Sequence, residues 1–344
     1  MRIGWPPLMQ DELLSSYLSR AAIGRGMSTQ SLGSLVCPGH AIWTRDVDIN
    51  ARAHTLNALA AAIGESLDCI KGMTLMGLSH PEPESPRWQG THHWLTSIGV
   101  YHRSRRRHGL CFCPVCLSES PFFRRQWRLA FWTVCPVHQV ILHDACPSCG
   151  GTLEPHRQQY DLRLCSRCDR SLVSGNCVTA VPSFLQGELY RACVQARLVQ
   201  DWPVARCTGG DYLLGMDALL SGFGVARVPD RSGQRNFRDR LEMRRVERRD
   251  ADLRLLEALC QAWPRSLHTA AEQYHLTQRS FRQQCPDWLT HEIGQLPPGR
   301  IRGEGNVGRG ALRIAAEAQQ WRKAGWRSLR AETLLKLIKP FNEH

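Results

Sequence analysis

Apolar residues recur at three- and four-residue steps along the first 105 residues of this 344-residue chain, which is the pattern of amphipathic helices. Ser28 or Thr29 is suited to cap a short helix through Leu35, and residues 51–63 form another alanine- and leucine-rich amphipathic segment. Prolines concentrated in residues 81–86 predict a loop. We therefore expect residues 1–105 to form a helical N-terminal domain. Its clearest helical face carries Leu13, Leu14, Tyr17, Leu18 and Ala21, with Asp11 and Glu12 suited to the start of the helix.

The pattern changes twice more along the chain. Residues 106–178 lack long periodic runs and are rich in cysteine, proline and glycine, whereas helical periodicity returns in residues 179–262. Within that region, the segment 234–254 is dense in charges of both signs, and we interpret it as a helix with a solvated, ion-paired face. Its expected buried stripe consists of Phe237, Leu241, Val246, Leu253 and Leu256.

The last region, residues 263–344, predicts a compact helical segment, then a loop rich in proline and glycine from Leu296 to Gly310, then a helix near residues 311–324. The expected fold is therefore mainly α with a small β content. It comprises a helical N-terminal domain, a tandem zinc-ribbon middle, a helical domain, and a helical C-terminal region containing a helix-turn-helix.

The spacing of the cysteines in the middle region indicates that they bind metal ions. Four ligand pairs, each with two intervening residues, follow one another in the sequence: Cys113 and Cys116, Cys135 and His138, Cys146 and Cys149, Cys165 and Cys168. A two-residue gap lets both side chains of a tight turn bind one ion, so eight ligands make one Cys₃His and one Cys₄ tetrahedron. Thiolate-rich tetrahedral sites are typical of zinc. We expect two structural Zn²⁺ ions.

Two pairings of these ligand turns are open. Sequential pairing gives two consecutive zinc ribbons, whereas a cross-brace has the first and third turns sharing an ion. The spacer from His138 to Cys146 is longer than the very short spacers typical of cross-braces, which favours sequential pairing. Cys111 and Cys177 flank the clusters, and we interpret both as bystanders. Since both coordination spheres would be full, no position remains for the water that catalytic zinc requires.

The charge balance indicates a polyanionic partner. Lys and Arg total 44 against 31 Asp and Glu, a formal net charge of +13. Of the 44, 40 are arginine, whose guanidinium suits phosphates and base edges, although codon usage explains the choice of arginine equally well. Basic residues are most concentrated in residues 101–109. This run predicts that Arg103, Arg105, Arg106 and Arg107 contact phosphates; the alternative is a solvated linker. Neither a signal peptide nor a membrane-length apolar stretch is evident, so we expect a soluble cytoplasmic protein with reduced cysteines.

Residues 267–285 fit a helix-turn-helix. Gln278, Arg279 and Arg282 would project from its second helix toward phosphates and base edges. His275 occupies a turn position where glycine is common, which weakens the match, and a protein-binding helical hairpin is the alternative. The framework positions are Thr269 at the start of the first helix, Ala270 and Ala271 at the helix crossing, Leu276 in the turn, Thr277 as the cap of the second helix and Phe281 as its anchor.

Four segments carry motifs of one known family: residues 7–21, 123–131, 133–138 and 142–150. Together they resemble the TniQ/TnsD family of transposition target-selection proteins. Residues 123–131 are similar to the arginine–tryptophan segment of the family, residues 133–138 to its Cys-Pro-x-His turn, and residues 142–150 to its Cys-Pro-x-Cys-Gly turn. Residues 7–21 resemble the opening motif of the family, with Tyr17 in place of the usual tryptophan and Leu13 in place of a frequent serine. The resemblance covers about residues 5–175.

The resemblance implies a non-enzymatic adaptor for a Tn7-like transposon. Members of this family recruit a TnsC-like AAA+ ATPase regulator, which engages the transposase. Some, of the TnsD type, bind a fixed DNA attachment site. Others bind a Cascade-type CRISPR effector with its guide RNA, often as homodimers. The length of this chain favours the adaptor class, working in the bacterial cytoplasm at the nucleoid.

The chain itself carries no phosphate-binding Gly-x-x-x-x-Gly-Lys-Ser/Thr loop, so an ATPase has to be a partner. An enzymatic alternative is a zinc-supported nuclease using His92 and His93. It lacks the accompanying Asn, His and carboxylate pair, and we do not favour it.

Overall fold

The computed structural model describes residues 4–78, 94–96, 98, 109–194, 207–223, 241–281 and 285–299. Several predicted features lie outside these residues. They are the loop at 81–86, the histidines at 92 and 93, the arginines at 103, 105, 106, 107 and 282, Phe237, and the helix at 311–324. The chain divides into two compact units, Met1–Pro182 with Leu241–Asp250, and Ser183–Arg240 with Ala251–His344. We describe each by itself.

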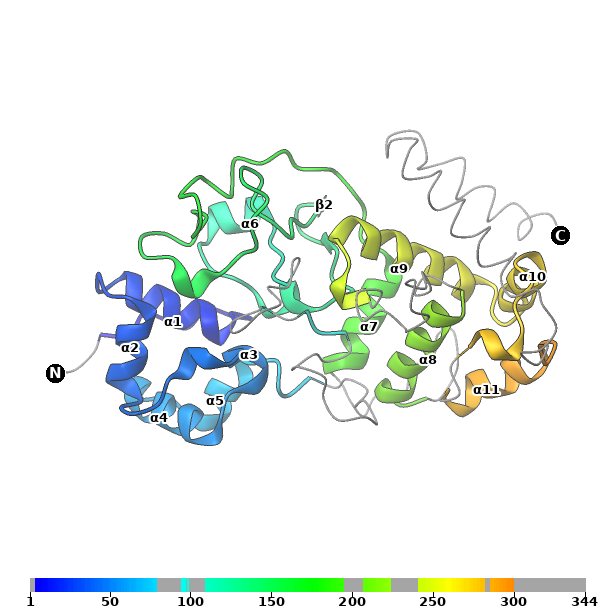
Figure 1. Ribbon diagram of the computed structural model, residues 1–344, viewed down its shortest axis with the longest axis horizontal. Helices are drawn as coiled ribbons and strands as arrows, with labels where there is room; N and C mark the ends of the chain where they lie inside the picture. The colour runs from blue at the N-terminus through cyan, green and yellow to red at the C-terminus, as the bar shows by residue number, and fades with distance from the viewer. Residues whose placement is uncertain are drawn as a thin grey trace, which may run out of the picture. The chain divides into compact units, whose positions relative to one another are not determined.

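The first unit begins with the predicted helical region (Figure 1). The predicted apolar face of the first helix is buried, with Leu14 and Tyr17 fully inaccessible to solvent. Ser28 caps the second helix as predicted, because its hydroxyl accepts the backbone N–H of Ser31. The elements are α1 (Leu14–Ile23), α2 (Thr29–Val36), η1 (Ile42–Thr44), α3 (Val47–Asn50), α4 (Ala53–Ile63) and α5 (Leu67–Gly72).

The cysteine-rich part of this unit has little regular structure. Strands β1 (Val134–Cys135) and β2 (Val140–Ile141) pair antiparallel, with Val134 opposite Ile141 and Cys135 opposite Val140. The segment 178–180 extends this hairpin through hydrogen bonds to β2 and the turn before it. The helical elements here are α6 (Pro114–Glu119), η2 (Arg125–Arg128) and η3 (Pro155–Arg157). The prediction of a mainly α fold with a small β content is confirmed.

A buried guanidinium joins the N-terminal helices to η2. Arg128 is fully buried and ion-paired with both Asp46 and Asp48. Its Nε donates to the carbonyl oxygen of Thr96 at 2.8 Å. Asp48 also accepts the backbone N–H and the hydroxyl of Ser15, at 2.8 and 2.7 Å. Burial raises the pKa of Asp48, and the Arg128 charge opposes this shift.

A second buried carboxylate lies at the start of α1. Glu12 is ion-paired with Arg20 at 2.6 Å and accepts the Ser16 hydroxyl at 2.9 Å. Ser16 in turn accepts the backbone N–H of Phe123, and Glu12 forms a backbone bridge with Arg124. The segment 123–131 is therefore attached to the start of α1 by the Phe123–Ser16 hydrogen bond and the Glu12–Arg124 backbone bridge.

The start of α9 (Val246–Gln261) belongs to the first unit. The Asp144 carboxylate accepts the backbone N–H of Val246 at 2.8 Å, which satisfies one of the free amides of the first helical turn. The Thr133 hydroxyl donates to Asp250 at 3.0 Å. Both contacts come from residues immediately beside metal-ligand turns.

The predicted solvated, ion-paired face is confirmed only in part: Arg245 and Glu247 form an accessible pair at 3.6 Å, whereas other charged residues point inward. Arg249, Asp250 and Asp252 are all buried. Arg249 donates to the carbonyl oxygen of Ala130 at 2.8 Å and to the Cys111 sulfur at 2.9 Å. The buried charges are compensated by hydrogen bonds to a backbone carbonyl, a hydroxyl and a thiol. The predicted stripe at Leu241, Val246, Leu253 and Leu256 is buried as expected.

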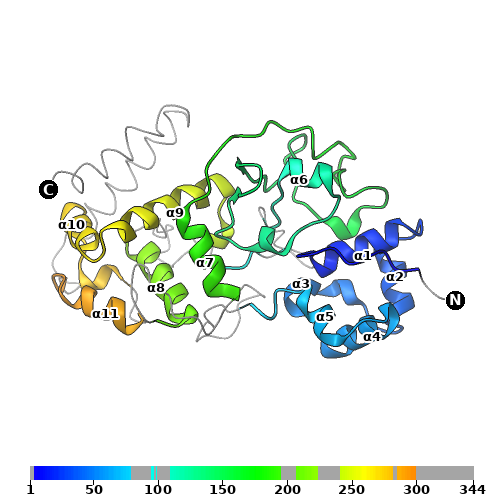
Figure 2. The same ribbon diagram turned by 180° about the vertical axis from the view of Figure 1, so that it is seen from behind.

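In the described residues of the second unit, all the named elements are helices (Figure 2). Two glycines of α8 allow close packing: a Cβ at Gly215 would overlap the ring of Trp288, and one at Gly222 would overlap the ring of Phe281. In its described residues, no helix of the chain is both long and apolar enough to cross a membrane. Besides the remainder of α9, its elements are α7 (Phe184–Val194), α8 (Gly209–Gly222), α10 (Arg265–Gln273), η6 (Gln278–Ser280) and α11 (Asp287–Gly294); η5 (Leu241–Met243) belongs to the first unit.

The described residues do not show a helix-turn-helix. The first helix, α10, begins at Arg265 rather than at Thr269, because Pro264 ends the preceding segment and the helix restarts directly after it. His275 has a φ of +53°, the conformation that favours glycine at this turn position. Thr277 forms the expected reciprocal cap with Ser280, but the element that follows is the single 3₁₀ turn η6. As predicted, Leu276 and Phe281 are buried.

The ion pairs of Arg128 give a first prediction. Replacing Arg128 by Ala leaves two buried carboxylates without their counter-charge, so we expect a loss of about 3–5 kcal/mol in the free energy of unfolding. The control is Arg157→Ala, which breaks the half-exposed pair with Glu154 and is expected to cost less than about 1 kcal/mol. Urea unfolding followed by circular dichroism measures both, and equal effects of the two substitutions would contradict the assignment.

A buried histidine connects α2 and η1 to η3. The ring of His156 stacks on Trp43 with centroids 5.3 Å apart and an interplanar angle of 16°. The hydroxyl of Thr29 donates to the carbonyl oxygen of His156. Burial, assisted by the charge of Arg157, lowers the pKa of His156 from 6.5 to about 4. Its imidazole is therefore neutral in the folded protein at neutral pH.

This histidine gives a pH prediction. Above pH 6.5 the imidazole is neutral whether the chain is folded or unfolded, and as the pH falls toward 4 only the unfolded chain takes up the proton. We therefore expect protonation of His156 in the unfolded chain to lower the free energy of unfolding by up to about 3 kcal/mol over this range. His156→Gln should flatten the acid side of the stability profile, and exposed His40→Gln should not. All three proteins keep the same metal ligands, so a His156→Gln profile identical to that of the parent protein would refute the prediction.

Candidate metal centres

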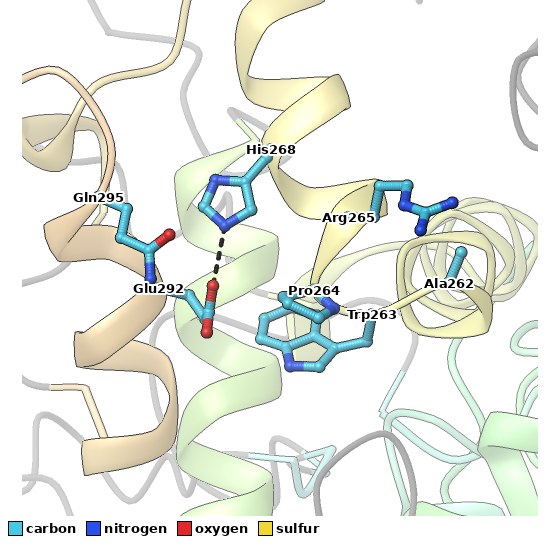
Figure 3. Close-up of a pocket in the computed structure, with 7 residues that line it drawn as sticks. All are labelled: Ala262, Trp263, Pro264, Arg265, His268, Glu292 and Gln295. Atoms are coloured by element: carbon cyan, nitrogen blue, oxygen red, sulfur yellow. Dashed lines mark hydrogen bonds and ion pairs between the residues drawn. The ribbon is translucent and has the colours of Figure 1, made fainter.

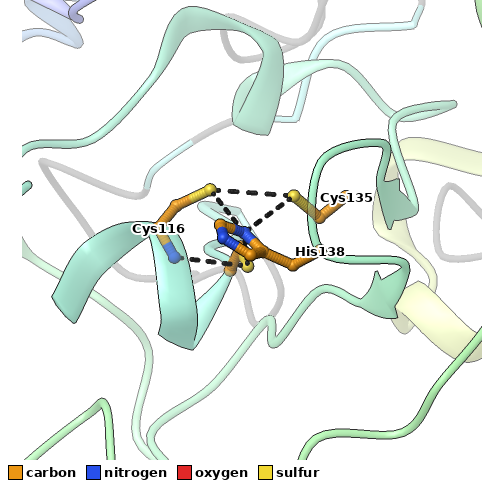
Figure 4. A group of neighbouring side chains, drawn as sticks. Cys116, Cys135 and His138 are labelled. Carbon is orange, nitrogen blue, oxygen red and sulfur yellow. Dashed lines mark hydrogen bonds between the residues drawn. The ribbon is translucent and has the colours of Figure 1, made fainter. Parts of the chain in front are cut away.

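The first cluster combines two different local structures. Cys113 is the N-cap of α6, and its sulfur accepts the backbone N–H of Cys116 at 3.5 Å. Cys135 ends β1, and His138 lies in the turn before β2 (Figure 4). The Cys116 sulfur is 3.7 Å from that of Cys135 and 3.2 Å from Nδ1 of His138. The four ligand atoms lie within 4.8 Å of one another.

The second cluster is built from two turns. The sulfur of Cys146 is 3.8 Å from that of Cys168, and the sulfur of Cys149 is 3.8 Å from that of Cys165. Again all four ligand atoms lie within 4.8 Å of one another. The sequential pairing predicted from the spacers is confirmed for both clusters.

Three of the four ligand turns share one backbone geometry. The residue after the second ligand is Gln139, Gly150 or Asp169, and each has a φ between 51° and 64°. Its N–H donates at 2.9 Å to the carbonyl oxygen of the first ligand in the same turn. This left-handed residue reverses the chain so that both ligand side chains point to one side. The turn at Cys113 differs because it continues into α6.

Both clusters fit a tetrahedral zinc ion. With zinc–sulfur bonds of about 2.3 Å, the edge of a tetrahedron is about 3.8 Å long, which is the separation of the sulfur pairs. The thiols of the first cluster also interact strongly with one another. The pKa of Cys116 is raised by its contacts with the Cys113 and Cys135 sulfurs, and that of Cys135 is lowered by the same two thiols. Three adjacent thiolates require a positive ion between them. The residues are therefore compatible with two structural zinc ions.

Glu119 is a functional residue that the sequence did not reveal. Its carboxylate lies 3.2 Å from Nε2 of His138, the ring nitrogen opposite the ligand atom. A carboxylate in this position fixes the histidine tautomer and orients the ring toward the metal. The signal in the sequence was weak, because 19 residues separate the two partners.

The remaining candidates lie apart from the clusters. Cys111 and Cys177 belong to neither cluster. Cys111 is buried against Arg249, and Cys177 is exposed. Of the predicted nucleic-acid contacts, only Gln278 and Arg279 are in described residues. The Gln278 amide donates to the carbonyl oxygens of Gly294 and Leu296, so it holds the end of α11. The roles of these residues toward nucleic acid stay predictions.

Substitution of single ligands tests the two clusters. Cys135→Ser and Cys149→Ser should each reduce the zinc content from two ions per chain to about one and unfold the surrounding turns. Cys177→Ser, which removes an exposed thiol outside the clusters, should retain both ions. Elemental analysis of the purified proteins measures the zinc content, and an undiminished content in the first two variants would show that the ligands are wrong.

Comparison with known proteins agrees with these features. A family model described as TniQ matches residues 4–142, which include the N-terminal helices, the buried Arg128 pairs and the whole first cluster. No curated protein matches the chain. The buried pairs and the cluster thus both fall within the matched region, and residues 4–142 of the chain are similar to the TniQ domain.

Proposed function

We propose that this protein is an adaptor that links a target-locating complex to a TnsC-like AAA+ regulator and thereby recruits the transposase. The observation that carries the proposal is the similarity to the TniQ domain over residues 4–142, since a TniQ domain implies target selection in Tn7-like transposition. The target-locating complex is a Cascade-type effector with its guide RNA, and the protein works in the cytoplasm at the nucleoid.

The metal clusters support an adaptor role over a catalytic one. Each cluster has four protein ligands, so a bound zinc ion has no open position at which water or substrate could bind. Zinc in such a site stabilises the fold and supplies no Lewis-acid chemistry. TniQ-family proteins are non-catalytic adaptors in transposition, in agreement with closed metal sites.

The metal-supported part of the chain also presents apolar side chains of the kind that protein interfaces bury. Val137, in the turn between β1 and β2, is 75% exposed, and Tyr160, which lies between the two ligand turns of the second cluster in the sequence, is 71% exposed. Val178 and Val181, next to the hairpin, are exposed as well. Exposed apolar residues that share a rigid, metal-stabilised support favour a partner protein as their ligand. We assign this surface to the AAA+ regulator.

Nucleic acid is assigned to the basic positions. We propose that Arg103, Arg105, Arg106 and Arg107 contact phosphates of the guide RNA or the target DNA, supported by the net charge of +13. Arg279 and Arg282 are the corresponding candidates in the C-terminal region. The alternative is a TnsD-type protein that itself recognises one attachment site.

Isolation of native complexes tests the proposal. The tagged full chain, purified from cells that carry its transposon, should bring down an AAA+ ATPase together with a CRISPR effector and its RNA. Val137→Asp and Tyr160→Asp should deplete the ATPase more than the effector. Joint replacement of Arg105, Arg106 and Arg107 by Ala should deplete the RNA and its effector.

Two results would contradict the adaptor. Absence of the ATPase from the complex refutes the link to the regulator. Binding of the purified chain to one unique duplex, with a strong preference over other sequences, would establish the attachment-site reading instead. Light scattering of the purified complex determines whether one or two copies of the chain take part.

A further inference from the structure

A cavity of about 570 Å³ lies in the second unit, between the start of α10 and the end of α11 (Figure 3). Cavities of this size hold small molecules or single nucleotides. It lies far along the sequence from both metal clusters, and all its lining residues belong to the second unit. Its chemistry is therefore independent of zinc.

One wall of the cavity is aromatic. Trp263 is half-buried, and its ring is held edge-to-face against Trp288 with centroids 5.4 Å apart and planes at 73°. Pro264 lies against the same part of the wall. An indole that is fixed on one side and accessible on another is suited to stack on a planar ligand.

The other groups are polar and of both signs. His268 and Glu292 meet across the cavity, with Nε2 2.8 Å from Oε2. Among the described residues, the second carboxylate oxygen of Glu292 accepts no hydrogen bond and the exposed Arg265 pairs with no carboxylate. The cavity therefore offers a planar surface, a free acceptor and a free cation.

We infer that this cavity binds one unpaired nucleotide of single-stranded DNA or RNA. The base stacks on Trp263, an exocyclic amino group donates to Glu292, and the phosphate pairs with Arg265. The negative charge of Glu292 disfavours an acidic peptide, and the positive charge of Arg265 disfavours a basic one. A nucleotide matches both residues, because its base carries an amino group and its phosphate carries a negative charge. A base within a duplex is stacked on both faces and is unable to reach the indole. The inference goes beyond the adaptor role and does not depend on it.

Three variants of the full chain, loaded with zinc, test the site by fluorescence anisotropy with labelled single strands of about 12 nucleotides. We expect Trp263→Leu to weaken binding of oligo(dC) about tenfold, and Arg265→Ala to weaken it about fivefold with a shallower salt dependence. The parent protein should prefer oligo(dC) to oligo(dT), which has no amino group, and Glu292→Gln should reduce that preference. Exposed Arg52→Ala is the matched control for loss of one positive charge, with an expected change below about twofold.

The same strands made abasic, and matched RNA strands, complete the test. Abasic strands should bind the parent protein as weakly as oligo(dC) binds Trp263→Leu, and comparison of oligo(rC) with oligo(dC) identifies the preferred sugar. Equal binding of abasic and intact strands, or unchanged binding by Trp263→Leu, overturns the inference. If Trp263→Leu instead loses a protein from the native complex while its binding to single strands is unchanged, the cavity is a protein-docking site and the inference is overturned. All three variants should still bring down the AAA+ ATPase, so failure here is distinguishable from failure of the adaptor proposal.

Discussion

Two clusters of metal-ligand residues join a stretch of chain that has little regular secondary structure. Between Cys113 and Cys168 the structure contains one short helix, one hairpin of two-residue strands and two isolated 3₁₀ turns. A structural zinc site contributes on the order of 10 kcal/mol to folding, comparable with the whole stability of a small domain. The two clusters therefore add to a hydrophobic core that includes Trp127, Phe131 and Leu142. Their closed geometry follows from the same requirement, because an open ligand position would weaken the support.

The buried polar groups are arranged around this support. Asp144 and Thr133 lie next to ligand turns, and both bind the first turns of α9, a helix that begins almost 80 residues after the last metal ligand. Arg249 fills the remaining space between Ala130 and Cys111. These contacts explain how a sequence dense in charge becomes buried: each charged group satisfies a backbone or side-chain group left unpaired by the irregular chain. The same argument applies to Arg128, whose two carboxylate partners come from the N-terminal helices.

The sequence predicted what depends on local spacing. The two-residue gaps identified all eight ligands, the apolar steps from Leu13 to Ala21 identified α1, and the serine at position 28 identified the cap of α2. The sequence did not predict features that depend on contacts between residues far apart in the chain. No local pattern distinguishes a buried Arg249 from an exposed one, and Glu119 is recognisable as a partner of His138 only once the hairpin is folded. The start of α10 was misplaced because Thr269 is a good cap residue, whereas the proline at position 264 determines where the helix restarts.

The residues that carry the family resemblance are largely internal. Ser15, Tyr17, Arg20 and Arg128 are buried or paired with buried carboxylates, and the Cys-Pro-Val-His turn supplies two ligand residues of the first cluster. A motif of this kind determines the fold of the domain, but it does not determine which partner the domain binds. Differences between proteins built on the same support must then arise from exposed residues such as Val137 and Tyr160, and from regions outside residues 4–142. The cavity beside Trp263 lies in such a region, which is where a property particular to this chain is expected.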